Sequence, residues 1–225
     1  MNLKKYILFL VLLTFGCSNE KDQMNVNISI DGFKKGKIYL QKIKDSILIN
    51  VDSVFIENKS QIMLTSKIDS PEFFYINLDV SKNENKIGFF GEKGDISIFT
   101  NLKKFNSEFN ISGSSNDSIY REYIGIIKKF NNNRLDLIKL SFDNLKNKDS
   151  ATIIQKKIEN LNKRQYLFSL NFAVTNGSSH VAPYIALSEF PESSKVLLDT
   201  IKNSLSIAVL NSKYGQMLQD LIKSK

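Results

Sequence analysis

Residues 25–112 alternate between hydrophobic and polar positions with a period of two, which predicts short β-strands with one buried face. Val26, Ile28 and Ile30, for example, are separated by Asn27 and Ser29. Similar stretches recur every 8–12 residues or so, a spacing typical of all-β domains. They occupy residues 38–40, 47–51, 54–56, 62–68, 73–78, 86–90, 95–99 and 109–111. The pattern predicts an antiparallel β-sandwich or an open barrel.

From Ser114 onward the hydrophobic spacing changes to that of amphipathic helices. A first helix is expected to be kinked or broken at Asn131-Asn132-Asn133, because asparagine weakens a helix interior. A second helix over residues 154–172 has Gln165 as a polar interruption and stops at Asn176-Gly177. Three shorter helices follow, the first two with Ser179 and Ser193 as predicted N-caps and the last over residues 211–223.

These two periodicities divide the chain into two domains of an α+β protein. We expect a β-rich domain at residues 25–113, an antiparallel sandwich or open barrel, followed by a helical domain at residues 114–225. The helices are short and closely connected, so they are expected to form a bundle of antiparallel neighbours.

The first residues have the pattern of a bacterial lipoprotein signal peptide. Lys4 and Lys5 precede an apolar run at residues 6–15, and Gly16 then stands before Cys17. The run is half the length of roughly twenty residues that a membrane span needs, so it is excluded from the fold. We expect cleavage after residue 16, acylation of Cys17 (palmitate among the acyl groups) and a polar tether at residues 17–24. The alternative is an ordinary signal peptide with a free thiol.

This prediction determines the expected location. The protein is expected to be a lipoprotein of the cell envelope, held on membrane lipid through acylated Cys17. The acidic residues just after the cysteine favour the outer membrane, with the periplasmic or surface side undecided.

Composition excludes several kinds of chemistry. The chain has one cysteine and one histidine, so it cannot form an internal disulfide or a CxxC centre. The net charge is +8, with the excess located after Gly113, but the basic residues are dispersed, and we expect no nucleic-acid binding. We expect no catalytic residues, no cofactor and no metal site, and therefore no enzyme.

Four sets of residues are candidate sites. His180 lacks a nucleophile motif and is expected to be a capping or surface residue. The run Gly113-Ser114-Ser115-Asn116 is expected to be a helix N-cap and turn rather than an anion nest. Three isolated acids are expected to be solvated turn residues: Asp31, Asp45 and Asp52. Five aromatic residues are expected to divide between the core and the contact with the helices: Phe73, Phe74, Tyr75, Phe89 and Phe90.

Short motifs in the strands resemble a known family. They are Gly36-Lys37-Ile38-Tyr39-Leu40, Asp52-Ser53-Val54, the hairpin from Gly88 to Ile98, and Ile111-Ser112-Gly113-Ser114-Ser115-Asn116 followed by Tyr120 and Tyr123. They are similar to the N-terminal domain of unknown function that precedes the thioredoxin-like domain in Gram-negative thiol:disulfide interchange lipoproteins. In the helical half, residues 180–184 and 212–215 are similar to the region between those two domains.

The chain departs from this family in two places. Residues 57–61 replace its usual turn, and the sequence reaches Lys225 without a thioredoxin domain. We therefore expect no redox chemistry of its own. The expected function is a non-catalytic binding or accessory module with protein partners, linked to envelope thiol-redox systems. Two alternatives remain: a subunit or truncated relative that positions a separate thioredoxin-like reductase, and a ligand-binding lipoprotein for nutrient capture.

Overall fold

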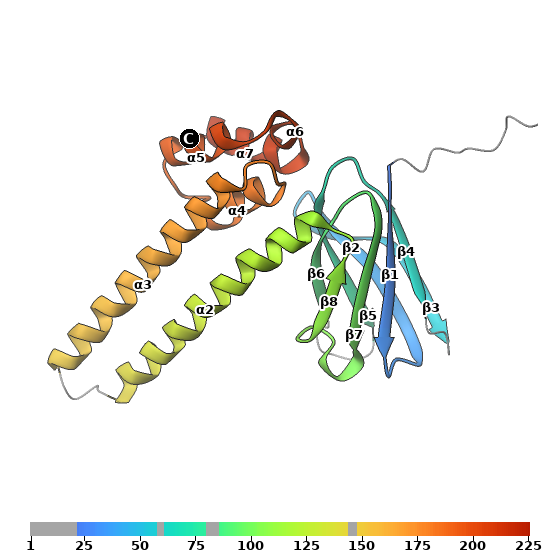
Figure 1. Ribbon diagram of the computed structural model, residues 1–225, viewed down its shortest axis with the longest axis horizontal. Helices are drawn as coiled ribbons and strands as arrows, with labels where there is room; N and C mark the ends of the chain where they lie inside the picture. The colour runs from blue at the N-terminus through green and yellow to red at the C-terminus, as the bar shows by residue number, and fades with distance from the viewer. Residues whose placement is uncertain (1–21, 58–60, 80–85, 144–147) are drawn as a thin grey trace, which may run out of the picture.

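The computed structural model describes residues 22–57, 61–79, 86–143 and 148–225. Eight strands form two four-stranded sheets that pack face to face, and the helices lie to one side of them (Figure 1). Sheet A has the order β4-β1-β7-β8, and sheet B has the order β3-β2-β5-β6. The strands are β1 (Gln23–Asp31), β2 (Lys35–Lys44), β3 (Ile47–Glu57), β4 (Ile62–Lys67), β5 (Glu72–Asp79), β6 (Lys86–Gly91), β7 (Gly94–Asn101) and β8 (Phe109–Ser112).

The sandwich is antiparallel except for one central pair. Strands β1 and β7 run parallel, with Val26 opposite Ile96 and Ile28 opposite Ile98. A parallel pair needs a long crossover connection, and here the strands between β1 and β7 in the chain provide it by way of sheet B. The predicted α+β class, with a β-sandwich before helices, is confirmed.

The space between the sheets is filled by the residues that the alternation marked as inward-facing. Val26, Ile28 and Ile96 of sheet A meet Leu40 and Phe74 of sheet B, and each is at most 2% exposed. Burying side chains of this size stabilises the fold by about 1.5–3 kcal/mol each. The other face of sheet A is polar and open, whereas part of the other face of sheet B is covered by the helices.

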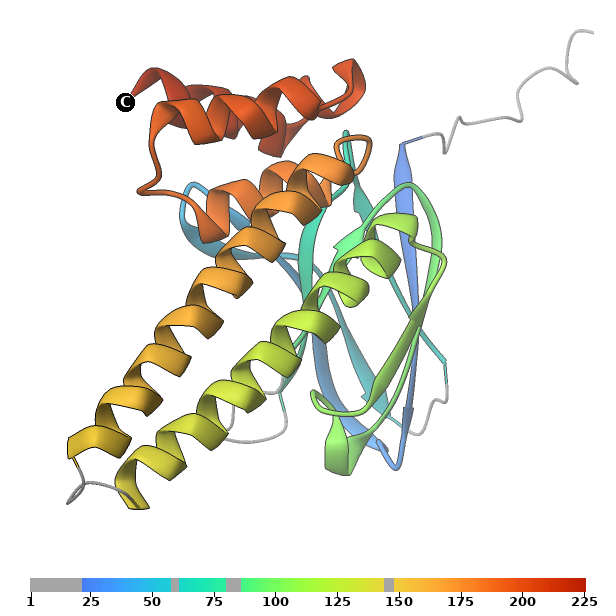
Figure 2. The same cartoon turned by 60° about the vertical axis from the view of Figure 1, so that its left-hand side comes forward.

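The helices form a long hairpin followed by a compact group. The hairpin consists of α2 (Ser115–Asp143) and α3 (Lys148–Thr175), which lie side by side and project away from the sandwich (Figure 2). The compact group comprises α4 (Val181–Glu189), α5 (Lys195–Ser204), α6 (Ile207–Leu210) and α7 (Lys213–Lys223); a 3-10 turn, η2 (Leu102–Lys104), lies between β7 and β8. The helical part is thus confirmed, but its first two helices are longer than the expected short elements.

The predicted kink or break at the asparagine triplet is wrong, because α2 continues through it. Arg134, one residue further on, donates hydrogen bonds to Asn131 Oδ1 (3.0 Å) and to Asn162 Oδ1 on α3 (3.0 Å), and a third to Gln165 Oε1. These hydrogen bonds pair polar side chains of α2 and α3, including Gln165, the polar residue that interrupts the hydrophobic face of α3. Tertiary contacts outweigh the modest helix propensity of asparagine.

The predicted N-caps are each displaced by one residue. Ser194, rather than Ser193, caps α5 and accepts a hydrogen bond from Leu197 N (3.4 Å). At α4 the N-cap is His180, and Ser179 Oγ accepts a hydrogen bond from Val181 N (3.2 Å).

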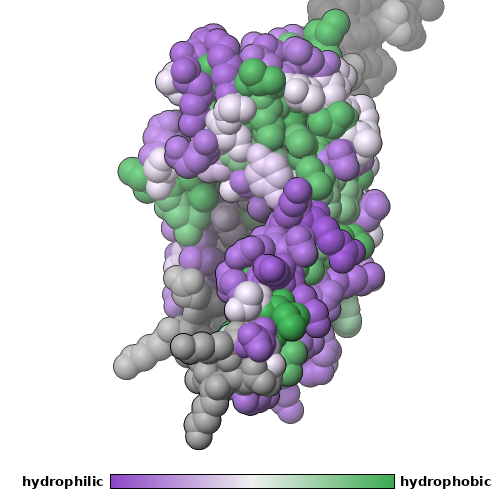
Figure 3. Space-filling model, turned by 90° about the vertical axis from the view of Figure 1, so that its left-hand side faces the viewer, coloured by the Kyte–Doolittle hydropathy of each residue, from purple (hydrophilic) through white to green (hydrophobic). Residues whose placement is uncertain are grey.

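A second hydrophobic cluster joins the helices to sheet B. Phe73 and Phe90 point out of the sandwich and pack among the buried side chains of the helices, such as Ile185 and Leu218. Seen from the helical side, the surface alternates between hydrophobic and hydrophilic areas (Figure 3). The two halves therefore share a core, and the join between them creates the largest hollow described below.

Candidate functional site

A groove of about 1080 Å³ lies where sheet B meets the helices. Its walls come from the β2–β3 hairpin, from residues 69–75 at the start of β5, and from α4 and the beginning of α7. We call it the junction groove. Its size is at the upper end of the range of ligand pockets, about 300–1000 Å³.

A buried carboxylate holds the two walls of the junction groove together. The side chain of Glu72 on β5 is 7% exposed and accepts a hydrogen bond from Lys42 Nζ of β2 (2.6 Å). Its other oxygen accepts one from Lys213 Nζ of α7, which also donates to the carbonyl of Ile43 (3.1 Å). A buried charge is tolerated only when it is paired, so these three side chains fix α7 against the sheet.

Three tyrosines, Tyr75, Tyr184 and Tyr214, line the groove, and a fourth, Tyr120, packs against Phe73 and Tyr184. Tyr214 OH accepts a hydrogen bond from Phe73 N (2.9 Å), and Tyr184 stacks on the Phe73 ring with centroids 5.3 Å apart. Burial raises the pKa of Tyr75, Tyr184 and Tyr214, and raises that of Tyr120 to about 12. All four phenols are therefore protonated at neutral pH. They provide apolar ring faces and neutral hydroxyl groups.

The five aromatic residues that sequence analysis considered as a ligand face are divided as alternation predicted. Phe74 and Phe89 lie in the sandwich core, whereas Phe73 and Phe90 belong to the helical cluster. Tyr75 is half-buried and lines the junction groove. Of the five, Phe73 and Tyr75 line the junction groove.

The outer rim of the groove exposes hydrophobic side chains. Ile43 of β2 is 46% exposed, and Met217 of α7 is 47% exposed. Next to Ile43, the tip of the β2–β3 hairpin turns through Asp45 and Ser46, whose φ angles are 48° and 66°. A two-residue hairpin of the type I′ class requires positive φ at both central residues, so this turn fixes the position of the Ile43 wall.

One buried polar atom beside the groove lacks a partner. Gln41 on β2 lies opposite Tyr75, and its Nε2 donates to Asn50 Oδ1 (2.7 Å). Its Oε1 accepts no hydrogen bond from the described residues. Buried acceptors normally receive a hydrogen bond, so the unpaired Oε1 of Gln41 is an exception.

The serine-rich run at the start of α2 contains the N-cap of the helix, as predicted. A carboxylate of the same chain, that of Glu92, is bound at this helix N-terminus. Ser114 Oγ accepts a hydrogen bond from Asp117 N (2.9 Å). The Glu92 carboxylate accepts hydrogen bonds from Ser115 N (2.8 Å) and from Asn116 N (3.2 Å) and Nδ2 (2.5 Å). Burial alone would raise the pKa of Glu92, but these hydrogen bonds lower it overall. The helix N-terminus is thus already occupied.

A buried ion pair completes this junction. Asp117 is 1% exposed and accepts hydrogen bonds from Phe90 N (3.0 Å) and from the Arg121 guanidinium (3.1 Å). Arg121 also donates to the carbonyl of Gly88. Sequence analysis did not single out Asp117 or Arg121; their i, i+4 spacing was the available signal.

His180 is a half-buried capping residue, as predicted. Its backbone N–H donates to Asn116 Oδ1 (3.0 Å), which also accepts from Ser179 Oγ (2.9 Å). Burial lowers the pKa of His180, and the Glu92 carboxylate partly opposes this. The imidazole is therefore neutral at pH 7 and its backbone, rather than its ring, ties α4 to α2.

The isolated acids do not gather into a site, and only Asp45 is the turn residue that was predicted; Asp52 lies half-buried within β3, and Asp31 is the last residue of β1. Asp31 accepts a hydrogen bond from Asn101 Nδ2 (2.7 Å), Asp52 accepts one from Thr65 N (2.8 Å), and Asp45 lies in the β2–β3 turn. Within the described ranges, no group of three or more His, Cys, Asp or Glu side chains could hold a metal ion.

The predicted lipidation residue, Cys17, lies outside the described residues, as do the signal segment and most of the tether. Among the helices that the structure describes, none is long and apolar enough to cross a bilayer.

Comparison with protein families assigns a domain to the β-rich half. Residues 24–120 match the family described as a domain of unknown function, DUF4369. The match covers the whole sandwich and the first turns of α2. No curated protein matches this chain.

Proposed function

We propose that this protein is a lipid-anchored protein of the cell envelope that acts as a non-catalytic accessory module and docks a partner protein in its junction groove. The anchor is proposed from the basic residues, apolar run and Gly16-Cys17 pair at the start of the chain. Two acyl chains or more would make the attachment stable, because each buried methylene contributes about 0.8 kcal/mol.

The observation that carries the docking proposal is that both the sheet and the helices contribute an exposed hydrophobic side chain to the junction groove. Ile43 and Met217 face solvent from two walls, above a base held by the Glu72 ion pairs and the tyrosine rings. Partner interfaces commonly combine aromatic and methionine side chains in this way. A rigid base also limits the entropy lost on binding.

Charges in the groove favour a particular kind of partner segment. Asp45 and Asp69 line the groove, are exposed, and form no ion pair with the described residues. Of the three lysines in the lining, Lys42 and Lys213 are engaged by Glu72, and Lys44 is exposed. With two such carboxylates against one such lysine, the groove suits an apolar side chain adjacent to a basic one.

The partner class that we propose is a thioredoxin-like thiol oxidoreductase of the envelope. Its support is the resemblance of the strand and helix motifs to the region that precedes such a domain, together with the DUF4369 match. The one cysteine in residues 1–225 is the proposed lipidation residue, so we propose that the partner supplies the reactive thiols.

Photo-crosslinking in envelopes tests the proposal. The photoreactive residue p-benzoylphenylalanine replaces Met217 in the groove, and in a matched control it replaces Val196, which is 76% exposed on α5. We expect one discrete adduct from position 217 and none from position 196, with the partner identified by mass spectrometry.

The outcomes are distinguishable. An adduct with a thioredoxin-like protein supports both the groove and the redox link. An adduct with an envelope protein of another class supports docking and rejects the redox link. Equal labelling from both positions, or none from position 217, rejects the groove as the docking site.

A further inference from the structure

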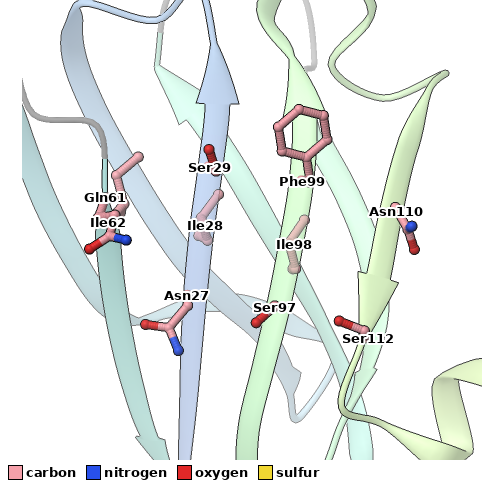
Figure 4. Close-up of a pocket in the computed structure, with 10 residues that line it drawn as sticks. All are labelled: Asn27, Ile28, Ser29, Gln61, Ile62, Ser97, Ile98, Phe99, Asn110 and Ser112. Atoms are coloured by element: carbon pink, nitrogen blue, oxygen red, sulfur yellow. The ribbon is translucent and has the colours of Figure 1, made fainter.

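The outer face of sheet A carries a second hollow, independent of the junction groove and of the docking proposed there. It has a volume of about 440 Å³ and is lined by β4, β1, β7 and β8 (Figure 4). The register places Asn27 beside Ser97, and Ser97 beside Ser112, across three neighbouring strands. In the next row Ser29, Phe99 and Asn110 are neighbours in the same order. The hollow therefore presents two rows of side chains on one face.

The polar side chains in these two rows are unpaired, unlike those in the rows on either side. On one side Asn25 Nδ2 donates to Asp95 Oδ1 (2.9 Å), and on the other Asn101 Nδ2 donates to Asp31 Oδ2 (2.7 Å). Between them, within the part of the chain that the structure describes, five side chains make no protein hydrogen bond: Asn27, Ser29, Ser97, Asn110 and Ser112. Their amides and hydroxyls offer both donors and acceptors to a ligand.

None of the ten residues that line the hollow has an ionisable side chain. In the whole sequence, 24% of the residues are charged. In the flanking rows of the same face, Asp31 and Asp95 carry carboxylates. An anionic ligand would find no cation among the lining residues and two carboxylates in the rows on either side. The electrostatics thus favour a neutral ligand.

Phe99 supplies an apolar platform in the middle of this polar face. Its side chain is 59% exposed and lies between Ser29 and Asn110 (Figure 4). A single exposed phenylalanine is ordinary on a protein surface. A flat aromatic ring surrounded by unpaired amides and hydroxyls, with charge excluded, is a more specific arrangement, because it matches a ligand with one C–H face and a polar periphery.

We infer that this face binds a neutral glycan. A pyranose ring has a C–H face that packs on the Phe99 ring, and hydroxyl groups at its edge that exchange hydrogen bonds with Asn27 and Asn110. A protein partner fits less well, since protein interfaces are depleted of serine at their centres, and three of the ten lining residues are serines.

The test uses the full chain, solubilised in detergent, on an array of neutral and acidic oligosaccharides. The neutral oligosaccharide bound most strongly is then titrated by calorimetry into the wild type and two variants. Phe99→Ala removes the platform, and Phe55→Ala removes a phenylalanine of matched exposure (56%) from β3 of the other sheet. Both side chains face solvent, so both variants are expected to fold.

We expect at least a tenfold loss of the association constant in Phe99→Ala and less than a twofold change in Phe55→Ala. A further loss in Asn27→Ala combined with Asn110→Ala would support the polar contacts. The inference is overturned if no neutral oligosaccharide on the array binds, if acidic oligosaccharides bind as tightly, or if Phe99→Ala leaves binding unchanged. A protein adduct that depends on Phe99 in the absence of glycan binding would also overturn it.

Discussion

The hydroxyl of Tyr214 on α7 accepts a hydrogen bond from the backbone N–H of Phe73 on β5, 141 residues earlier in the chain, at 2.9 Å. Tyr214 and Phe73 are 8% and 9% exposed, so the bond is buried at the inner end of the junction groove. Together with the contacts of Lys213 Nζ, which pairs with Glu72 and donates to the carbonyl of Ile43, it holds α7 on sheet B.

Tyr214→Phe is expected to destabilise the protein by about 1–3 kcal/mol, because it leaves the buried Phe73 N–H without an acceptor. Chemical denaturation measures the change in the free energy of unfolding. Tyr166→Phe is the matched control: Tyr166 is 41% exposed and pairs with Ser193 Oγ at 3.3 Å. We expect the control to change stability by less than about 0.5 kcal/mol. Equal losses in the two variants would show that the Tyr214 bond does not stabilise the junction.

The ion pair between Glu72 and Lys213 is expected to couple by about 1.5–3 kcal/mol, because the carboxylate is buried and receives charged hydrogen bonds. A double-mutant cycle with Glu72→Gln and Lys213→Met measures this coupling free energy. Lys35 and Glu57 form the control pair, since their side chains are 64% and 59% exposed. An exposed pair is expected to couple by less than about 1 kcal/mol. If the coupling free energy between Glu72 and Lys213 is no larger than that of the control pair, this ion pair does not hold α7 on the sheet.

The Glu92 carboxylate is expected to make the stability of the protein depend on pH. Its pKa is lowered in the folded state, so its contribution is fully present above the ordinary glutamate value of 4.5 and is lost as the pH falls through the folded pKa. At pH 7 we expect Glu92→Gln to be less stable than the wild type by about 1 kcal/mol, the typical value of an anion at a helix N-terminus.

The same difference is expected to shrink as the pH is lowered below the ordinary glutamate value of 4.5 and through the lower folded pKa, where the wild-type carboxyl becomes protonated. Thermal or urea unfolding at a series of pH values follows the difference. Glu192→Gln serves as the control, since the Glu192 side chain is 95% exposed. A difference for Glu92→Gln that is independent of pH would rule out the carboxylate as the cause.

Lipidation at Cys17 predicts both a mass and a location. The mature protein is expected to begin at Cys17 and to carry acyl chains, which intact-mass spectrometry detects directly. Cys17→Ala is expected to move the protein from the membrane fraction to the soluble fraction, while its folding is unchanged. An unmodified thiol on a mature chain, or a Cys17→Ala variant that remains in the membrane fraction, would reject the anchor.

Local periodicity made much of the β-rich half predictable. The alternation of Val26, Ile28 and Ile30 with polar residues is a property of a single strand, and all three are buried. The same reasoning separated Phe74, in the sandwich core, from Phe73, which faces the helices. The parallel pairing of β1 with β7 was not predictable, because it depends on which strands meet in space.

The helical half shows where local rules are insufficient. The asparagine triplet indicated a kink or break in α2, but pairing of Arg134 with side chains of α3 keeps the helix continuous. The capping role of Ser114 was predictable from its place before a helix. The carboxylate that accepts from Ser115 N, that of Glu92, lies more than twenty residues away and had no local signal.

The sequence by itself determined the two kinds of secondary structure, the buried face of each element and the predicted lipoprotein start, because periodicity and composition are encoded in neighbouring residues. Tertiary structure decided the two surfaces on which function is proposed. The junction groove exists because α7 packs on β5, and the uncharged hollow exists because β1, β7 and β8 lie side by side. Both depend on contacts between distant residues, whose energies are summed over the whole fold rather than specified by any one segment.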